Sequence, residues 1–310
     1  MPAPPTDLAT LRGVLGIRAR VDHPIGPLTT YRVGGAAALF AVPDDESQLV
    51  EVARGLTGLE VSVLALGRGS NLLVADRGFE GLVVSLGTGF DQLSIDGDRV
   101  EAGAAVSLPV LARRTAAAGL HGLEWAVGVP GSVGGAIRMN AGGHGSDTAA
   151  TLVAYRWVDL ASGLVHEAPA ERLAFGYRHA DLAPTEVVVA GVYQLEPGSP
   201  EASKATIDEI VRWRRANQPG GSNAGSVFTN PPDDSAGRLI EESGLKGFRI
   251  GTAEVSTKHA NFIQADPGGS ADDAERLIAH VQAAVAAATG VDLRTEVRLV
   301  GFSESRTGAG

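Results

Sequence analysis

The organisation of this chain is decided by Gly122-Leu-Glu-Trp-Ala-Val-Gly-Val-Pro-Gly-Ser-Val-Gly-Gly-Ala-Ile-Arg-Met-Asn-Ala-Gly-Gly-His-Gly145, in which eight of 24 residues are glycine. Its central part, residues 129–136, carries no charged group and little side-chain bulk. Such backbone can approach a ligand closely, and positive φ angles at glycine let several N–H groups converge on one anion. The stretch therefore predicts a diphosphate-binding turn or a glycine-rich surface loop, and a lone glycine pattern does not decide between them.

A second glycine-rich turn, Gly67-Arg-Gly-Ser-Asn71, follows a predicted buried strand over residues 61–66. A Rossmann dinucleotide loop opens a helix, whereas Leu72-Leu-Val-Ala-Asp76 has the pattern of a strand. The pattern therefore disfavours a Rossmann site. Two such turns in one chain nevertheless favour the diphosphate interpretation of the longer stretch.

Composition narrows the classes of function. The 310 residues leave room for two or three domains, and a net charge of −10 argues against a nucleic-acid partner but not against a small anionic ligand. The absence of cysteine excludes disulfides, thiolate metal sites and cysteinyl flavin attachment. No histidine pair has metal-ligand spacing, so no metal is expected. Without a signal peptide or a membrane-length apolar run, we expect a cytoplasmic protein with no membrane partner.

The hydrophobic pattern predicts an α+β chain. A loose lead-in is expected over residues 1–27, and then a small β-α-β unit over 38–66 whose helix begins at Asp44 or Asp45. Further helices are expected over residues 107–118, 201–217, 235–243 and 271–289. The alternating residues 291–300 predict a half-buried strand, and residues 303–310 a disordered tail.

Three side chains are candidates for chemistry. Ser226 lies in a glycine turn that can present its hydroxyl, although turn serines more often bond their own backbone. Glu296 lies among charged residues on the polar face of the last strand, where solvation is the simpler explanation. Arg178 follows an aromatic pair, and its guanidinium suits either a ligand carboxylate or a surface ion pair.

Taken in order, the segments resemble the bacterial UDP-N-acetylenolpyruvoylglucosamine reductases, the MurB family, over nearly the whole chain. The resemblance rests on the following segments: Thr30-Tyr-Arg-Val-Gly-Gly35, Leu66-Gly-Arg-Gly-Ser-Asn-Leu-Leu-Val74, Gly128-Val-Pro-Gly-Ser-Val-Gly-Gly135, Met139-Asn-Ala-Gly142, Phe175-Gly-Tyr-Arg178, Ala224-Gly-Ser-Val-Phe228 with Asn230-Pro231, Ser256-x-Lys-His-Ala-Asn-Phe262 and Glu296-Val-Arg298. Each segment alone is weak evidence, but the set in this spacing is highly specific.

The resemblance implies an FAD-binding fold of the vanillyl-alcohol-oxidase (PCMH) type in two lobes, plus a C-terminal α+β substrate-binding domain. Residues 1–66 would form the small β-α-β lobe, and residues 67–199 the larger lobe, to which a strand from 291–302 returns. Residues 200–290 would bind substrate. The short connection from Arg178 to Ser226 is similar to the family's shorter subtype. FAD would be bound non-covalently, with its diphosphate on the two glycine-rich turns.

The activity that the resemblance implies is NADPH-dependent reduction of UDP-N-acetylglucosamine enolpyruvate to UDP-N-acetylmuramate through FAD, in bacterial peptidoglycan precursor synthesis. Arg178 and Glu296 would contact the substrate carboxylate, and Ser226 would give a proton to the α-carbon. A glutamate beside a carboxylate has to hold or share a proton, which burial can enforce. The partners would be the sugar nucleotide and NADPH, and the protein a monomer.

The resemblance also implies a set of binding residues. The expected cofactor contacts are Tyr31, Gly67, Arg68, Gly69, Ser70, Asn71, Leu72, Gly128, Val129, Pro130, Gly131, Ser132, Gly134, Gly135, Asn140, Ala141 and Gly142. The expected substrate contacts are Tyr177, Arg215, Gln218, Asn230, Lys258, His259 and Asn261.

Some positions depart from the family pattern. Thr229 stands where the family usually has lysine, Thr295 where it has proline, and Ser222-Asn223 replaces a commoner Pro-Ser. These departures bear on nucleotide contacts and leave the three catalytic candidates intact. Two alternatives stay open: an FAD oxidase of the same fold, which oxygen uptake with a sugar alcohol would indicate, and a catalytically silent sugar-nucleotide sensor, which a flavin-free protein would indicate.

Overall fold

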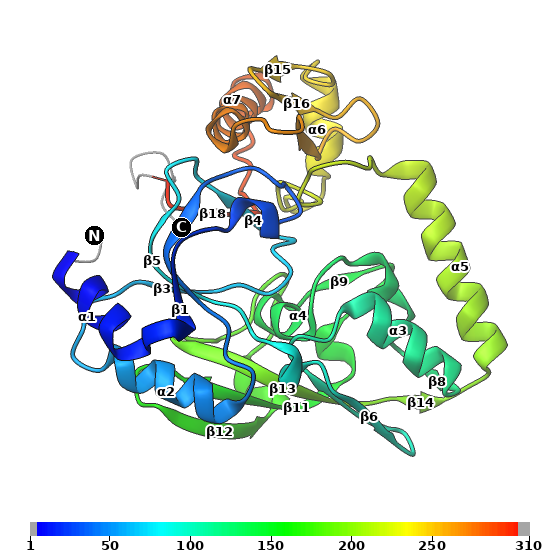
Figure 1. Ribbon diagram of the computed structural model, residues 1–310. Coiled ribbons are helices and arrows are strands. Elements are labelled where there is room, and N and C mark those ends of the chain that lie inside the picture. Colours follow the sequence, from blue (N-terminus) through cyan, green and yellow to red (C-terminus); the bar gives the residue numbers. More distant parts are fainter. Residues whose placement is uncertain (1–4, 303–310) are drawn as a thin grey trace. The chain divides into compact units, whose positions relative to one another are not determined.

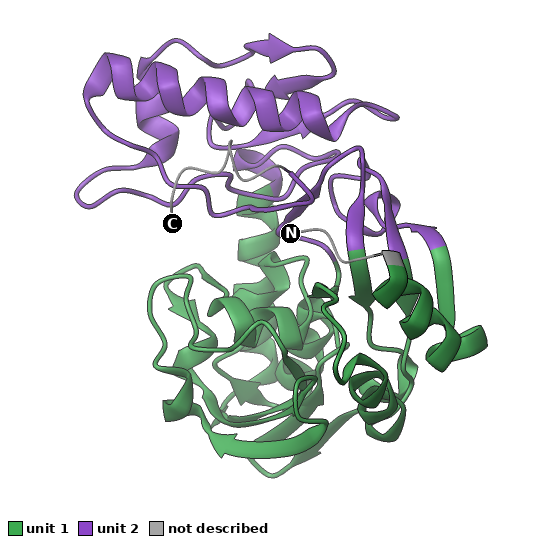
Figure 2. Cartoon of the chain, turned by 90° about the vertical axis from the view of Figure 1, so that its left-hand side faces the viewer, with its two compact units in different colours: residues 1–21, 39–68, 81–214 green, residues 22–38, 69–80, 215–310 purple. Residues whose placement is uncertain are grey.

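The computed structural model describes residues 5–302 and divides the chain into two compact units (Figure 2). Unit 1 comprises residues 1–21, 39–68 and 81–214, and unit 2 comprises residues 22–38, 69–80 and 215–310. These units are coarser than the three predicted domains, whose boundaries stay a prediction. The tail predicted over residues 303–310 lies outside the described residues.

The N-terminal part of the chain forms a four-stranded sheet of order β1-β2-β5-β3 (Figure 1). Its strands are β1 (Ala19–Pro24), β2 (Ala36–Ala41), β3 (Val63–Ala65) and β5 (Phe79–Val84), of which β3 and β5 are parallel. Helix α2 (Glu46–Leu56) connects β2 to β3, as predicted. It begins after Asp45, whose carboxylate accepts a hydrogen bond from the Gln48 N–H at 2.8 Å.

The prediction of a loose lead-in over residues 1–27 is wrong from residue 5 onward, and residues 1–4 lie outside the described residues. Helix α1 (Pro5–Leu15) precedes β1 and contacts α2. The apolar residues Leu8, Leu11 and Leu15 recur at helical spacing and pack into the core of unit 1 together with Leu49. Burial of these three leucines therefore stabilises helix α1, although the chain begins with several prolines.

The main sheet of unit 1 has five antiparallel strands in the order β12-β11-β13-β7-β6. The strands are β6 (Leu93–Asp96), β7 (Arg99–Gly103), β11 (Leu152–Asp159), β12 (Leu164–Pro169) and β13 (Glu186–Gln194). Helices α3 (Leu108–Ala117) and α4 (Val133–Met139) share a hydrophobic core with it. A Cβ at Gly191 of β13 would lie 2.7 Å from Cδ1 of Ile137, so glycine there lets α4 approach the sheet closely.

Helix α4 lies inside the glycine-rich stretch, which the sequence pattern indicates only as a turn. Two short ladders complete unit 1: β8 (Leu120–His121) pairs with β14 (Glu196–Pro197), and β9 (Gly142–Gly143) with β10 (Ser146–Asp147). The long helix α5 (Pro200–Asn217) follows, close to its predicted bounds (Figure 1).

Unit 2 is built on helix α7 (Ala271–Thr289), which contacts a three-stranded antiparallel sheet. The sheet strands are β15 (Arg249–Ile250), β16 (Ala253–Val255) and β17 (Ile263–Ala265), and α6 (Ala236–Glu242) completes the layer. Both helices match their predictions. Strand β4 (Leu72–Val74) pairs in parallel with β18 (Arg298–Val300). Of the predicted strand over 291–300, only β18 and an isolated bridge from Thr295 to Phe228 form.

Candidate active site

A cavity of about 270 Å³ in unit 1 brings parts of both glycine-rich turns together. Gly67 and Arg68 line it from the end of β3, and Ser132, Gly134 and Gly135 from the beginning of α4. The cavity lies near the lower end of the roughly 300–1,000 Å³ found for ligand pockets, so it suits a part of a dinucleotide rather than a whole one.

Two glycines of these turns make close approaches to neighbouring residues. A Cβ at Gly67 would lie 2.6 Å from Oγ of Ser132, and a Cβ at Gly134 would lie 2.9 Å from Cβ of Ala104. The N–H groups of Val133 and Gly134 donate to the backbone oxygens of Val106 and Ala104 at 2.9 and 3.0 Å. The N–H groups of Val133 and Gly134 therefore do not converge on an anion, as the sequence pattern suggested for this stretch, but attach the stretch to neighbouring backbone.

Arg138 also lines the cavity, and the sequence reasoning missed it. Its guanidinium donates to the backbone oxygens of Leu182, Ala183 and Glu186. No sequence signal pointed to Arg138, because the stretch is predicted as a turn and the helical spacing that places Arg138 beside Gly134 appears only in the structure. Arg68 and Arg138 are the charged residues of the lining, which contains no acidic side chain. A basic, glycine-rich wall fits an anionic group such as the diphosphate of FAD.

The rest of the first turn belongs to unit 2. Gly69 has φ 59° and approaches Thr29 so closely that a Cβ would lie 2.6 Å from its Cα. Its backbone oxygen accepts from the Thr30 N–H at 3.2 Å. Tyr31 is fully buried in the core of unit 2, and within residues 5–302 its hydroxyl has no hydrogen-bond partner. Burial raises the pKa of Tyr31. A side chain without exposed surface is poorly placed for direct cofactor contact.

Most other predicted cofactor residues of unit 1 lie around α4. Gly128 ends a 3-10 helix, and Gly131 accepts from the Leu108 N–H through its backbone oxygen at 3.0 Å. Ala141 accepts from the Thr148 N–H at 2.9 Å, and Gly142 belongs to β9. Val129 is half-buried and Pro130 exposed, so this part of the stretch retains accessible surface.

Arg178 lies at the tip of a tight turn in unit 1. Gly176 and His179 exchange two backbone hydrogen bonds, of 3.0 and 3.2 Å, which leave Tyr177 and Arg178 between them. Arg178 has φ 55°, in the left-handed region, and its guanidinium carbon lies 5.3 Å from the Tyr177 ring centroid. Tyr177 is 65% exposed, so the turn projects from its surroundings.

Ser226 and Glu296 lie on neighbouring segments of unit 2. The Glu296 N–H donates to the backbone oxygen of Val227, the residue after Ser226, at 2.8 Å. An isolated bridge between Phe228 and Thr295 continues this pairing. Glu296 is half-buried, whereas Thr295 and the other charged residues of its segment are exposed. The structure thus brings two of the three predicted catalytic residues onto paired backbone, whereas Arg178 belongs to unit 1.

Asn261, predicted as a substrate contact, holds the Ser226 segment. Its backbone oxygen accepts from the Val227 N–H, and its side chain accepts from and donates to the Phe228 backbone at 3.0 and 2.8 Å. Asn261 is 3% exposed. Its amide is therefore occupied in positioning the main chain next to Ser226.

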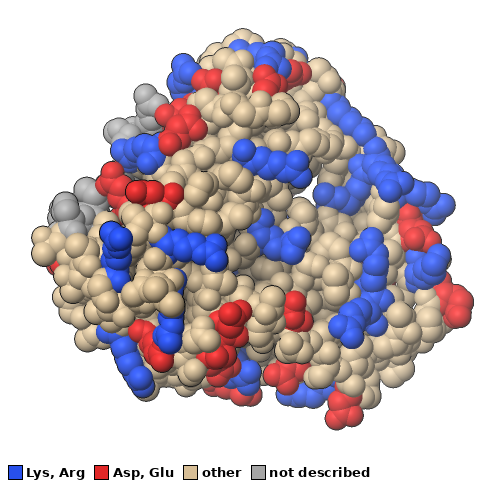
Figure 3. Space-filling model, in the orientation of Figure 1, with Lys and Arg blue, Asp and Glu red and all other residues tan. Residues whose placement is uncertain are grey.

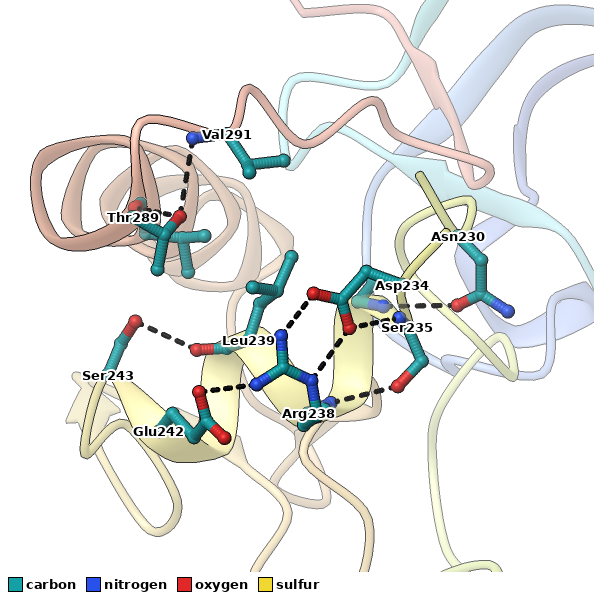
Figure 4. A network of polar contacts seen from close by, with 11 residues as sticks. Asn230, Asp234, Ser235, Arg238, Leu239, Glu242, Ser243, Thr289 and Val291 are labelled. Carbon is teal, nitrogen blue, oxygen red and sulfur yellow. Dashed lines mark hydrogen bonds and ion pairs between the residues drawn. The ribbon is translucent and has the colours of Figure 1, made fainter. Parts of the chain in front are cut away.

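Asn230 has a similar structural contact: its Oδ1 accepts from the Ala236 N–H at the beginning of α6 (Figure 4). In the same view Arg238 lies between Asp234 and Glu242 and pairs with both. Asn230 is exposed, and the bond to Ala236 uses only its oxygen, so its Nδ2 group lies on an accessible residue.

The remaining predicted substrate contacts also lie in unit 2. Lys258 donates to the backbone oxygen of Arg215, which is itself exposed. Nδ1 of His259 accepts from the Asn261 N–H at 3.2 Å, and burial, followed by nearby Lys246, lowers the pKa of His259, which favours the neutral ring. Gln218 has a buried Oε1 with no partner among the described residues.

Basic side chains gather over α3 and α5 on the face drawn in Figure 3. Arg214 of α5 is half-buried against Gly128, where a Cβ would lie 3.3 Å from its guanidinium nitrogen. Burial lowers the pKa of Arg214. The pKa of His144 is also lowered, first by burial of the His144 ring and then by the positive charge of Arg214. A local positive field of this kind attracts anions in spite of the net negative charge.

Residues 5–302 contain no cluster of three or more histidine, aspartate or glutamate side chains that could hold a metal ion. Within the same range, no helix has the length and apolar character that crossing a membrane would need.

Two family models match the chain. One, described as an FAD binding domain, covers residues 37–168, and the other, described as the C-terminal domain of UDP-N-acetylenolpyruvoylglucosamine reductase, covers residues 217–300. The matches confirm the predicted FAD-binding fold with an additional C-terminal domain, and they show that FAD is the cofactor.

Comparisons with individual proteins agree with these two family models. The chain is 43% identical over 294 residues to the UDP-N-acetylenolpyruvoylglucosamine reductase of Heliobacterium modesticaldum, which covers 93% of both chains. The chain is 41% identical over 300 residues to the reductase of Caulobacter vibrioides, and the alignment covers 96% of this chain and 98% of that protein. The crystal structure of the Thermus caldophilus enzyme superimposes with a TM-score of 0.81 at 35% identity, covering 91% of this chain and 99% of that one. The chain therefore belongs to the family of UDP-N-acetylenolpyruvoylglucosamine reductases.

Proposed function

We propose that this chain reduces UDP-N-acetylglucosamine enolpyruvate to UDP-N-acetylmuramate with NADPH, using Arg178, Ser226 and Glu296 as catalytic residues. The observation that carries the proposal is the pairing of the Ser226 and Glu296 segments through the Glu296 N–H and the Val227 oxygen at 2.8 Å. Family membership gives the reaction, and this pairing supports the assignment of a hydroxyl and a carboxyl group to one site.

The overall reaction adds a hydride and a proton across the vinyl bond of the substrate, and NADPH becomes NADP⁺. When bound, FAD supplies the two-electron carrier that takes hydride from NADPH and returns it to the vinyl CH₂ carbon. The cavity residues Gly67, Arg68, Ser132 and Arg138 would hold its diphosphate, and the absence of a side chain at Gly134 would let it approach closely. Two arginines in a lining without acidic side chains supply the positive charge that such a group requires.

Ser226 would donate the proton to the α-carbon. Ser226 follows Gly225, whose φ of 78° makes a turn, and Ser226 itself is half-buried. The turn would therefore present the hydroxyl at a partly desolvated position. A serine hydroxyl is a weak acid, and the donor that restores its proton has to be a neighbouring group or water. The buried Asn261 fixes the main chain on the other side of Ser226 through Val227 and Phe228.

Glu296 and Arg178 would act on the substrate carboxylate, into which negative charge spreads as hydride reaches the vinyl carbon. A guanidinium fork stabilises that charge through two parallel hydrogen bonds. A protonated Glu296 would donate a further hydrogen bond to the carboxylate. NADPH and the sugar nucleotide are the proposed small-molecule partners, and we propose that the enzyme acts as a cytoplasmic monomer.

The test separates the two halves of the reaction under anaerobic conditions. NADPH should bleach the flavin absorbance of the purified protein, and the enolpyruvyl sugar nucleotide should then restore it with formation of UDP-N-acetylmuramate. A flavin that oxygen reoxidises with a sugar alcohol as substrate, but that the enolpyruvyl compound leaves bleached, would identify an oxidase instead. A protein that takes up no FAD would refute the proposal.

A further inference from the structure

Asn140 is almost completely buried in unit 1, with 4% of its surface exposed. It ends α4 in the left-handed conformation, with φ 41°. Its Nδ2 donates to Oδ2 of Asp147 at 3.1 Å and to the backbone oxygen of Gly176 at 3.0 Å, while its Oδ1 accepts from the Ala149 N–H at 3.0 Å. Both N–H donors of the amide are therefore occupied inside the protein.

The contact with Gly176 reaches the turn that carries Arg178. The Gly176 oxygen also accepts the His179 N–H, so Asn140 bonds the atom that closes the turn. Arg178 is held with φ 55°, a conformation that is strained for a side chain with a Cβ and persists only where the surroundings fix it. The backbone conformation from which the Arg178 side chain starts thus depends on how firmly the base of the turn is held.

We infer that Asn140 is a positioning residue that orients Arg178 for the substrate carboxylate, rather than a side-chain contact to the cofactor. The inference rests on the proposed role of Arg178. Asparagine suits this position because it tolerates the left-handed conformation and supplies two donors. Glycine would supply the conformation without the donors, and aspartate would keep the shape while placing a second carboxylate beside Asp147.

The contrast between the aspartate and glycine substitutions at Asn140 allows the inference to be tested. Asn140→Asp and Asn140→Gly both remove the two hydrogen bonds that Nδ2 donates, and Asn140→Gly also removes the bond that Oδ1 accepts from the Ala149 N–H. Each variant is compared with Arg178→Ala and with the double variant Asn140→Asp/Arg178→Ala. FAD affinity is measured by fluorescence quenching, and flavin reduction by NADPH and reoxidation by UDP-N-acetylglucosamine enolpyruvate are followed separately. Loss of positioning should slow reoxidation by at least ~10-fold, because a small displacement of a binding group costs about this much or more.

For both Asn140 variants we expect FAD affinity and NADPH-driven reduction within about twofold of the wild type, as no substrate carboxylate takes part in those steps. The double variant should reoxidise as slowly as Arg178→Ala alone, since residues acting through one another are not additive. Multiplicative slowing in the double variant, or loss of FAD binding in the single ones, would overturn the inference. Wild-type reoxidation by Arg178→Ala would instead refute the proposed role of Arg178, without reference to any Asn140 variant.

Discussion

The side-chain amide of Asn71 donates a hydrogen bond to the backbone oxygen of Glu296 at 3.0 Å, across 225 residues of sequence. The backbone oxygen of Asn71 accepts in turn from the Arg298 N–H at 3.0 Å. Together with the bond from the Glu296 N–H to Val227, these contacts fix the main chain of Glu296 on both of its edges. The first glycine-rich turn therefore does more than approach a ligand: it aligns a proposed catalytic carboxyl group.

Asn71→Asp should weaken catalysis through this contact. The substitution keeps the size of the side chain but removes the donor to the Glu296 oxygen, so we expect reoxidation of the flavin by the enolpyruvyl substrate to slow by ~10-fold and unfolding free energy to fall by about 1 kcal/mol. Stopped-flow absorbance and urea unfolding measure the two effects, and a fluorescence titration shows whether FAD affinity changes as well.

Gln282→Glu is the matched control, because its Nε2 donates to the Leu293 backbone oxygen at 2.9 Å in the same unit. It should lose a comparable amount of stability while its reoxidation rate stays at the wild-type value. Equal slowing in both variants would mean that Asn71 acts through general stability and not through Glu296.

Ser226→Ala should separate the two half-reactions. Removing the proposed proton donor should slow reoxidation by ~10³-fold, within the range that a positioned acid contributes, and should leave NADPH-driven bleaching within about twofold of the wild type. Ser222→Ala, in the same loop, should change neither step. Anaerobic stopped-flow absorbance checks both rates, and normal reoxidation by Ser226→Ala would remove Ser226 from the mechanism.

Gly134→Ala should damage the cavity of unit 1. The added methyl group would lie 2.9 Å from Cβ of Ala104, and the clash would displace the beginning of α4 from the hydrogen bond that fastens it. Overpacking of this kind costs about 1–3 kcal/mol of stability. If the cavity holds the FAD diphosphate, FAD affinity should fall by at least ~10-fold as well.

Gly13→Ala is the control for that substitution, because nothing lies within 4 Å of its Cβ position and helix α1 tolerates alanine. It should raise stability by up to ~1 kcal/mol and leave FAD binding unchanged. Wild-type FAD affinity in Gly134→Ala would mean that the cofactor diphosphate is bound elsewhere.

The sequence predicts those parts of the fold whose patterns are local. Helix α7 begins and ends where periodicity and Gly290 indicate, and α2 begins at the predicted cap. Helix α4 could not be found in this way, because Gly134 and Gly135 lower helix propensity and the contacts that stabilise the helix, above all with β13, are made by residues distant in sequence. Most of residues 291–300 pair with no strand, because Glu296 bonds a loop instead of a sheet edge.

The candidate site, like the fold, was predictable from the sequence only in part. Residue types and order indicated Ser226, Glu296 and Arg178. The sequence alone could not distinguish asparagine side chains that contact a ligand from those that hydrogen-bond to the protein backbone, because the same residue type serves both purposes. The amides of Asn71, Asn140 and Asn261 bond protein backbone in this structure, and only three-dimensional contacts reveal that use.

The last prediction concerns the acid stability of unit 1. Glu124 is 5% exposed, and its carboxylate accepts from the Gly122 N–H at 2.9 Å and from Oγ of Ser203 on α5, and contacts Nδ1 of His121. Burial alone would raise the pKa of Glu124, but the hydrogen bonds from Ser203 and Gly122 outweigh burial and lower it below the ordinary 4.5.

Because the pKa of Glu124 is lower in the folded chain than in the unfolded one, the carboxylate contributes stability above about pH 4.5, and this contribution is lost as the pH falls through the folded-state pKa. Glu124→Gln should therefore cost about 1–3 kcal/mol at pH 7, where the amide would turn a donor or a weaker acceptor toward the Gly122 N–H. Urea unfolding at a series of pH values should show the deficit shrinking toward acid, whereas Glu209→Gln, at an exposed position of α5, should follow the wild type throughout. A deficit that stays constant below pH 4 would mean that the charge of Glu124 does not stabilise the fold, and that its packing alone joins α5 to the glycine-rich stretch.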